Sequence, residues 1–289
     1  MLKGVLIMLA AGLILSTGGS IIREIDEATG FQIVFWRSVS QSVLVFLFLF
    51  FRDYRSVFNT FVGIGLPGMG ASICLGLAFF GFVFSITNTT VANTMFLISS
   101  VPFFTAVLAW PLLKERVAGV TWIAILVALT GVLVMVSQAL ALGKLFGNVM
   151  GLFCAISTAF YIIFIRWGAA AGRQVEMIPV VCLAGIVAAL LAFSLEGGDI
   201  FVSRNDFLWS IAAGALQNGP GFMLFTIAAR YLPAAELALL GLVEVIISPI
   251  WVWLLYDEIP ALFTLVGGSL VLLAVIGLSS WTIWRTNTK

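Results

Sequence analysis

The stretch AAELALLGLVEVIISPIWVWLLY, residues 234–256, is apolar and long enough to cross a lipid bilayer, yet it carries an acid, Glu244, near its midpoint. A charged side chain at bilayer depth costs roughly 2.5 to 3.5 kcal/mol on insertion scales, so such residues usually face protein or water and mark a pathway. Glu244 is therefore the first candidate functional residue. The alternative interpretation is a structural glutamate that is protonated or paired.

A stretch of the same kind lies earlier in the chain, at residues 91–113, with the sequence VANTMFLISSVPFFTAVLAWPLL. Three pairs of identical residues in or just after the two stretches are separated by the same 143 positions: Trp110 and Trp253, Glu115 and Glu258, Thr121 and Thr264. This offset is about half of the chain length. It predicts two repeats, at residues 1–138 and 144–289.

The composition excludes a soluble domain. Hydrophobic residues make up 62% of the 289 residues and charged residues 9%, with a mean hydropathy of +1.18, and no globule has enough interior to hide that surface. A net charge of +1 gives no sign of a nucleic-acid partner. The three cysteines lie in apolar stretches and are odd in number, and histidine is absent, so we expect no disulfide framework and no metal site.

Ten apolar stretches of about 20 residues, the length of a membrane-spanning helix, follow one another with short connections. They lie at residues 2–22, 31–51, 61–86, 91–113, 117–136, 147–165, 177–195, 207–229, 234–256 and 262–284. They lack the two-residue alternation of a membrane barrel strand. The predicted fold class is an all-α polytopic membrane protein with ten transmembrane helices in two five-helix repeats.

The basic residues predict the orientation. Of the 14 lysines and arginines, ten fall on the side that holds both termini, three on the other side, and Arg37 lies within a stretch. The positive-inside rule then places both termini in the cytoplasm, with the chain in the cytoplasmic (inner) membrane. Because each repeat has an odd number of helices, the second repeat is inverted. Inverted repeats that enclose a site near the midplane are a transporter architecture.

The residues also resemble a known family. Residues 102–135 and 249–278 are similar to the two copies of an EamA-type repeat of the drug/metabolite transporter superfamily. The resemblance covers nearly the whole chain and implies ten helices in two inverted halves, carriage of small metabolites and no prosthetic group. The sequence departs from the family pattern in two places. Leu15 and Ser16 stand where many members carry tryptophan before a small residue, and Val245 stands where many have proline, which we expect to remove a kink beside Glu244.

A polar interruption in the eighth stretch gives the second candidate site: Gln217, Asn218, Gly219, Pro220 and Gly221. The proline removes one backbone hydrogen bond and blocks another. The freed carbonyls and the two amides need partners, which a cavity or a substrate can supply. We therefore expect the two amides to bind substrate and the Gly-Pro-Gly segment to act as a hinge; a packing kink is the alternative.

The 143-residue offset adds candidates in the first repeat. Gln217 corresponds to Cys74, which we take as a further substrate-binding candidate, and Glu244 corresponds to Val101. Pro102, beside Val101, is expected to bend the fourth stretch and to act as a hinge.

Hydroxyl residues in two other stretches complete the list of substrate-binding candidates: Ser16, Thr17 and Tyr161. Small and hydroxyl residues in membrane helices most often permit close packing. The family resemblance implies that these helices border the cavity, so both interpretations stay open.

Arg37 lies about a turn and a half inside its stretch. Two interpretations are open for its side chain. It snorkels to the headgroups, or it points inward as the counter-ion of Glu244 or of a substrate carboxylate.

The sequence predicts a secondary active transporter of small metabolites that works by alternating access. Amino acids, aromatic ones first, are the favoured substrates because the family includes aromatic amino acid exporters, and protons coupled through Glu244 are the expected driving ion. A carrier of organic cations or other metabolites, and an uncoupled facilitator or channel, are the alternatives. No nucleophile with a base is apparent, which argues against an enzyme. The expected partners are a small-molecule substrate and the bilayer, with the chain as a monomer or homodimer.

Overall fold

The computed structural model describes residues 2–89, 91–114, 118–136, 145–170, 177–256 and scattered positions between 266 and 281. Every regular element in these ranges is helical: α1 (Leu2–Leu15), α2 (Gly18–Arg23), α3 (Gly30–Arg52), α4 (Val57–Gly63), α5 (Gly65–Asn88), α6 (Val91–Ile98), α7 (Val101–Leu113), α8 (Gly119–Val136), α9 (Leu145–Ala170), α10 (Ile178–Leu195), α11 (Arg204–Ala212), the π-helix η1 (Ala213–Asn218), α12 (Gly219–Ala228), α13 (Ala234–Gly241) and α14 (Val243–Tyr256).

Six helical segments of the described chain are long and apolar enough to cross a membrane: Leu2–Arg23, Gly30–Arg52, Gly65–Asn88, Leu145–Gly168, Ile178–Leu195 and Ala234–Leu255. Two shorter apolar helices follow the same composition, Val101–Leu113 and Gly119–Gly131. The predicted span at 262–284 lies largely outside the described residues, as does the start of the one at 117–136. The all-helical, membrane-protein part of the prediction is confirmed.

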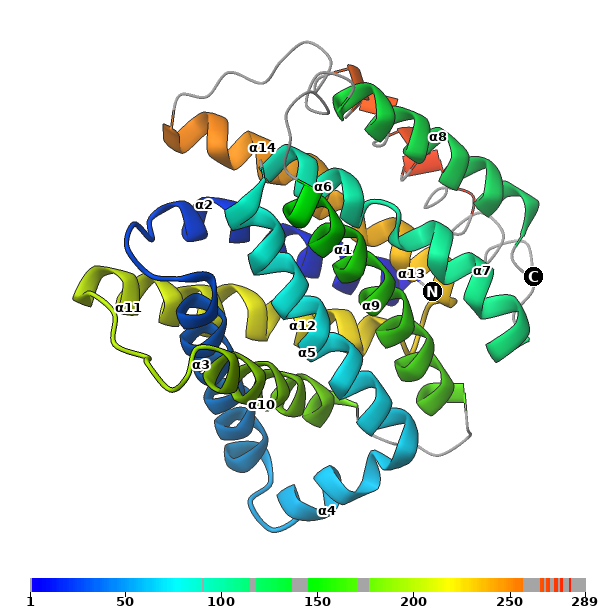
Figure 1. Ribbon diagram of the computed structural model, residues 1–289. Coiled ribbons are helices and arrows are strands. Elements are labelled where there is room, and N and C mark those ends of the chain that lie inside the picture. Colours follow the sequence, from blue (N-terminus) through cyan, green and yellow to red (C-terminus); the bar gives the residue numbers. More distant parts are fainter. Residues whose placement is uncertain are drawn as a thin grey trace.

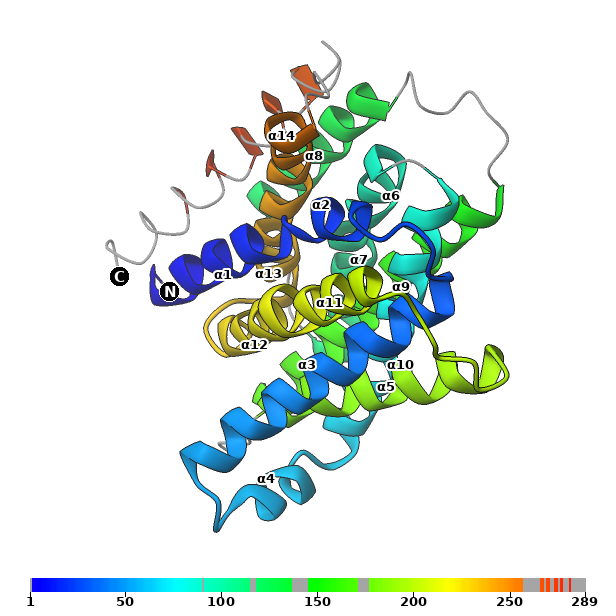
Figure 2. The same cartoon turned by 90° about the vertical axis from the view of Figure 1, so that its left-hand side faces the viewer.

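The centre of the bundle is built from helices of both halves of the sequence. α5 packs along α9, and α3 packs along α10, which also contacts α5. Figures 1 and 2 show α5 and α9 in the middle of the molecule, with α4 and α8 at opposite extremes. A cavity at the centre can therefore draw its walls from both halves.

Glycines allow this close packing. A Cβ atom on Gly81 of α5 would lie 2.9 Å from the Met150 carbonyl oxygen of α9, and one on Gly185 of α10 would lie 2.1 Å from Ser42 Oγ of α3. Small residues at such contacts let membrane helices approach until their backbones touch.

Several predicted spans are interrupted. The first breaks at a turn between α1 and α2, the third breaks near its start at Ile64, between α4 and α5, and the eighth changes to a π-helix in its middle. The fourth breaks after Ile98, just before Pro102, as expected of a proline near a helix start. These breaks expose backbone groups inside the bundle.

The expectation that Val245 removes the kink beside Glu244 is wrong. α13 ends at Gly241 and α14 begins at Val243, although no proline lies at the break. The Leu242 amide donates to the Leu239 carbonyl oxygen at 3.1 Å, three residues back, so a tight turn of 3₁₀ type makes the bend. The bounds of α6 and α13 stand 143 positions apart at both ends, the same offset as the paired residues of the sequence.

Asp206 ties two distant segments together at one end of the bundle. It is buried, and its carboxylate accepts backbone hydrogen bonds from Asp26, Glu27 and Ala28 at 3.2, 3.1 and 2.9 Å. The α2–α3 loop is thereby fixed to the first turn of α11.

Replacing Asp206 by alanine should therefore lower the free energy of unfolding by about 3 kcal/mol, because three amides lose a charged acceptor. The measurement is the thermal unfolding temperature of the purified protein in detergent. Asn205→Ala is the matched control, since Asn205 makes a single exposed hydrogen bond to the Glu24 carbonyl oxygen. Equal shifts in the two variants would contradict the assigned role of the carboxylate.

Candidate functional site

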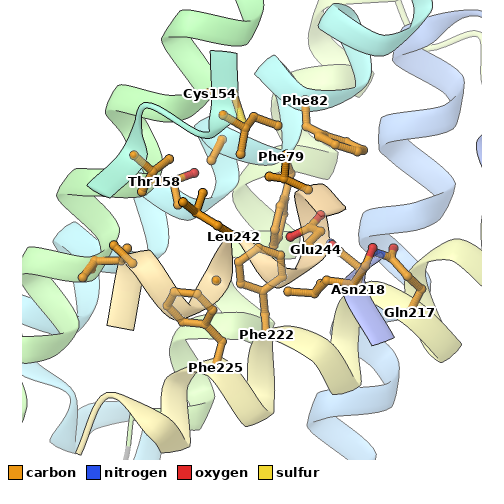
Figure 3. Close-up of a pocket in the computed structure, with 18 of the residues that line it drawn as sticks. Phe79, Phe82, Cys154, Thr158, Gln217, Asn218, Phe222, Phe225, Leu242 and Glu244 are labelled. Carbon is orange, nitrogen blue, oxygen red and sulfur yellow. The ribbon is translucent and has the colours of Figure 1, made fainter. Parts of the chain in front are cut away.

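A cavity at the centre of the bundle collects the charged and amide residues of the predicted site. It is lined by residues of α1, α3, α5, α6, α7, α9, η1, α12, α13 and α14, among them Arg37, Gln217, Asn218 and Glu244. In the view of Figure 3, the Glu244 side chain points into the pocket on the same side as the two amides. The space open to water-sized molecules is about 70 Å³, so a ring-bearing ligand would need the walls to move apart.

Arg37 points inward and does not snorkel. It is 3% exposed and donates from Nη2 to Oδ1 of Asn218 at 2.6 Å. Its Nε and Nη1 have no hydrogen-bond partner among the described residues. The guanidinium carbon lies 5.1 Å from the ring centre of Phe82 and 5.8 Å from that of Phe79, where the faces of both rings favour a cation. Two buried donors are therefore available to an anionic group in the cavity.

Glu244 sits where the backbone is suited to an acid. It is the second residue of α14, in the first turn, where the positive end of the helix dipole favours an acid. The side chain is half-buried and lines the same cavity as Arg37. Val101, its counterpart at the 143-residue offset, lines this cavity too and begins α7.

Gln217 connects the π-helix to the broken first span. Its Nε2 donates at 3.0 Å to the carbonyl oxygen of Leu15, the last residue of α1, which the break leaves without its helical partner. Its Oε1 is buried and has no hydrogen-bond partner in the described ranges. This oxygen is therefore an acceptor available to a ligand.

The π-helix puts Gln217 and Asn218 on the cavity wall. The Gly219 amide donates to the Gly214 carbonyl oxygen, five residues back, which is the π-helical pattern. Pro220 has no amide to donate, so the wider turn lies directly before the residue that would interrupt an α-helix. π-Turns of this kind frequently occur at functional sites.

Phenylalanine rings form the apolar part of the wall. The Phe79 and Phe222 rings meet edge to face with centroids 5.0 Å apart, and Phe222 lies 6.0 Å from Phe225. Figure 3 shows the labelled side chains of Phe222 and Phe225 below Glu244, and both residues line the same cavity. The cavity thus offers charges, an amide acceptor and aromatic faces to one ligand.

The model of the EamA-like transporter family matches the chain twice, over residues 2–137 and 145–280. The chain belongs to the EamA-like transporter family. It is 25% identical to the pseudopaline exporter CntI of Pseudomonas aeruginosa over 285 residues, covering 96% of each chain. It is 27% identical to an uncharacterized transporter of Archaeoglobus fulgidus over 254 residues, 84% of this chain and 89% of that one. A crystal structure at 17% identity shares the fold, with a TM-score of 0.75 over 94% of both chains.

Four other candidates of this EamA-like transporter lie outside the cavity lining. Tyr161 is fully buried and shares a 2.6 Å hydrogen bond with the Thr226 hydroxyl. Ser16 accepts a hydrogen bond from Trp251 Nε1 at 2.8 Å, and Thr17 donates to a carbonyl oxygen of α1 at 2.8 Å. Cys74 is half-buried on α5. In the present arrangement these residues support the helices around the cavity.

The hinge candidates lie at helix junctions beside the cavity. Pro102 is in the first turn of α7, and Gly219 and Pro220 begin α12. A Cβ atom on Gly221 would lie 2.5 Å from Leu15 Cδ2, so this glycine allows α12 to pack on the end of α1.

Gln41 and Cys154 are parts of the site that the sequence reasoning missed. Cys154 and Thr158 line the cavity from α9. Gln41 is a buried amide one helical turn after Arg37, and it accepts a hydrogen bond from Asn218 Nδ2. An amide at the fourth position after a buried arginine was a signal available in the sequence, because residues i and i+4 share a helix face.

Gly214 should not tolerate a side chain. A Cβ atom there would lie 1.9 Å from both the Arg37 carbonyl oxygen and Ser40 Oγ, so Gly214→Ala must push η1 away from α3. We expect a loss of about 3 kcal/mol in the free energy of unfolding, measured as a lower thermal unfolding temperature. Gly241→Ala is the control, because its Cβ would lie 3.3 Å from the flexible end of Met8 and 3.6 Å from the Phe225 ring, which are contacts that need little movement. Equal unfolding temperatures in the two variants would overturn this packing account.

Proposed function

We propose that this EamA-like transporter carries small zwitterionic metabolites, amino acids with aromatic side chains first, by alternating access through the central cavity. Arg37 binds the substrate carboxylate, Glu244 faces the substrate ammonium group, and the phenylalanine rings take the side chain. The Gln217 Oε1 accepts a further hydrogen bond from the ammonium group.

The observation that carries this proposal is that a basic and an acidic side chain line the same cavity while hydrogen-bond donors of the basic one stay unpaired. Two nitrogens of Arg37 have no partner in the described chain, although Glu244 lines the same space. An uncompensated charge in a membrane span is expensive and usually functional. A zwitterion supplies a partner for each charge.

The narrowness of the cavity supports a moving carrier. About 70 Å³ of open space is too little for an aromatic amino acid, so binding requires the surrounding helices to separate. The breaks before Val101 and Val243 and the Gly219–Gly221 segment are where we expect the helices to bend.

The proposal also covers the topology of the whole chain, the direction of transport and its driving reaction. Ten helices in two inverted halves, residues 1–138 and 144–289, would enclose the site near the midplane, with both termini in the cytoplasm. Export is the proposed direction, since one relative at 25% identity is named as an exporter. Proton coupling through Glu244 is proposed as the driving reaction.

A carrier of organic cations is the second candidate. Glu244 and the faces of Phe79 and Phe222 could hold a cationic amine. Arg37 on the same wall disfavours it, because a lone cation would meet an unneutralised positive charge. An uncoupled facilitator would use the same cavity without a proton step.

Counterflow in proteoliposomes tests the proposal. Vesicles are loaded with unlabelled aromatic and aliphatic amino acids, an organic amine and a nucleoside, and uptake of each labelled compound is followed. Saturable exchange of L-phenylalanine above the other compounds is the expected result. Exchange of the amine alone would favour the cation carrier, and no exchange of any compound by folded protein would contradict the proposed substrate class.

A further inference from the structure

We infer that Gln41 is a positioning residue that sets the orientation of the Arg37 guanidinium in the cavity. The inference rests on the proposed function, in which Arg37 binds the substrate carboxylate. Gln41 is fully buried on α3, one turn after Arg37, and does not line the cavity. It acts on Arg37 through Asn218, which does.

A row of three hydrogen bonds links Val181, Gln41, Asn218 and Arg37. One backbone carbonyl fixes the direction of all three. The Val181 carbonyl oxygen on α10 can only accept, and Gln41 donates to it from Nε2 at 2.7 Å. The Gln41 Oε1 is thus left to accept a short hydrogen bond from Asn218 Nδ2. Asn218 must then present Oδ1 to Arg37, and this oxygen accepts from Nη2 at 2.6 Å.

The consequence is an arginine that is held at one nitrogen and open at the others. Without Gln41, the Asn218 amide could rotate and turn Nδ2, a donor, toward the guanidinium, which has only donors. Arg37 would then lose its anchor, and its Nε and Nη1, which have no partner in the described chain, would no longer have a defined position. A carboxylate binds an arginine well only when the donors are held in place.

The neighbouring residue provides a matched control. Ser42 donates from Oγ to the Cys182 carbonyl oxygen at 2.9 Å, so it crosses the same α3–α10 contact as Gln41 and bonds the adjacent carbonyl. It does not line the cavity, and it takes no part in the hydrogen bonds that link Gln41, Asn218 and Arg37. Ser42→Ala therefore weakens the helix contact and leaves the orientation of Arg37 intact.

The first test needs no substrate. Gln41→Met replaces the amide by an apolar side chain of similar length, and phenylglyoxal, which condenses with the Nη nitrogens of arginine, reports how firmly Nη2 is held. We expect Arg37, quantified by peptide mass spectrometry, to react several-fold faster in Gln41→Met than in the wild type, and unchanged in Ser42→Ala. Equal reaction rates of Arg37 in Gln41→Met and the wild type would overturn the inference.

The second test asks whether this orientation serves a carboxylate. In Gln41→Met, the concentration of L-phenylalanine that halves the exchange of labelled substrate should be about tenfold higher than in the wild type. The corresponding concentration of phenethylamine, which lacks the carboxylate, should stay unchanged. The ratio is taken within one sample, so the amount of folded protein does not affect it. Equal losses for both ligands would reduce Gln41 to a structural role. If the wild type binds neither ligand, the proposed substrate class fails, whereas the phenylglyoxal rates still decide the role of Gln41.

Discussion

Replacing Arg37 by glutamine should raise the KM for exchange of L-phenylalanine about 100-fold. Loss of one member of a buried charge pair costs about 2–5 kcal/mol, and about 2.7 kcal/mol corresponds to a factor of 100. The measurement is exchange kinetics in proteoliposomes over a range of substrate concentrations.

Arg166→Gln is the control for this prediction. Arg166 donates from Nη1 to the Ala229 carbonyl oxygen at 2.8 Å and does not line the cavity. The same chemical change there should leave the KM near that of the wild type. A KM that rises equally in both variants, or in neither, would contradict the placing of the substrate carboxylate on Arg37.

Replacing Glu244 by glutamine should abolish proton-driven accumulation. One pH unit across the membrane is worth about 1.4 kcal/mol per proton, enough for about a tenfold concentration ratio of substrate. The glutamine amide cannot take up or release a proton near neutral pH. The imposed pH gradient should therefore no longer change the distribution of labelled substrate. The measurement compares accumulation with and without a pH gradient.

Glu236→Gln is the matched acid in the same span. Glu236 lies in the first turn of α13, is buried and does not line the cavity. It should retain the gradient response. An unchanged response in Glu244→Gln would show that Glu244 does not carry the coupling proton, although it could still bind the substrate.

The all-helical membrane character could be predicted because it depends on composition and stretch length alone. The 143-residue offset of the sequence also reappears in the bounds of α6 and α13. The break at Leu242 could not be predicted, because the valine at position 245, where many members have proline, indicated an unbroken helix. A 3₁₀ turn needs only a local change of hydrogen bonding, which leaves no residue-type signature.

The cavity was predicted in part. Charged and amide residues in apolar stretches identified Glu244, Arg37, Gln217 and Asn218, because such groups need partners in a membrane interior. The inward direction of Arg37 depended on Asn218, which is 181 residues away, and a single-span reading cannot supply that contact.

The hydroxyl candidates show the limit of residue type as a guide. Ser16 and Tyr161 are on helices around the cavity, but their hydroxyls are engaged by Trp251 and Thr226. Which face of a membrane helix meets a cavity depends on its rotation in the bundle, and small polar residues serve packing equally well.

Protection of Cys154 by a transported compound tests whether the substrate binds in the central cavity. Cys154 lines the cavity from α9, whereas Cys182 lines a groove between α3 and α10 and serves as the internal control. Modification of both thiols by methyl methanethiosulfonate is followed by mass spectrometry at increasing L-phenylalanine. We predict that L-phenylalanine protects Cys154 alone. The modification of Cys154 should fall by half at the L-phenylalanine concentration that half-saturates exchange. Unchanged modification of Cys154 in the presence of a compound that is transported would place the transport site outside the central cavity.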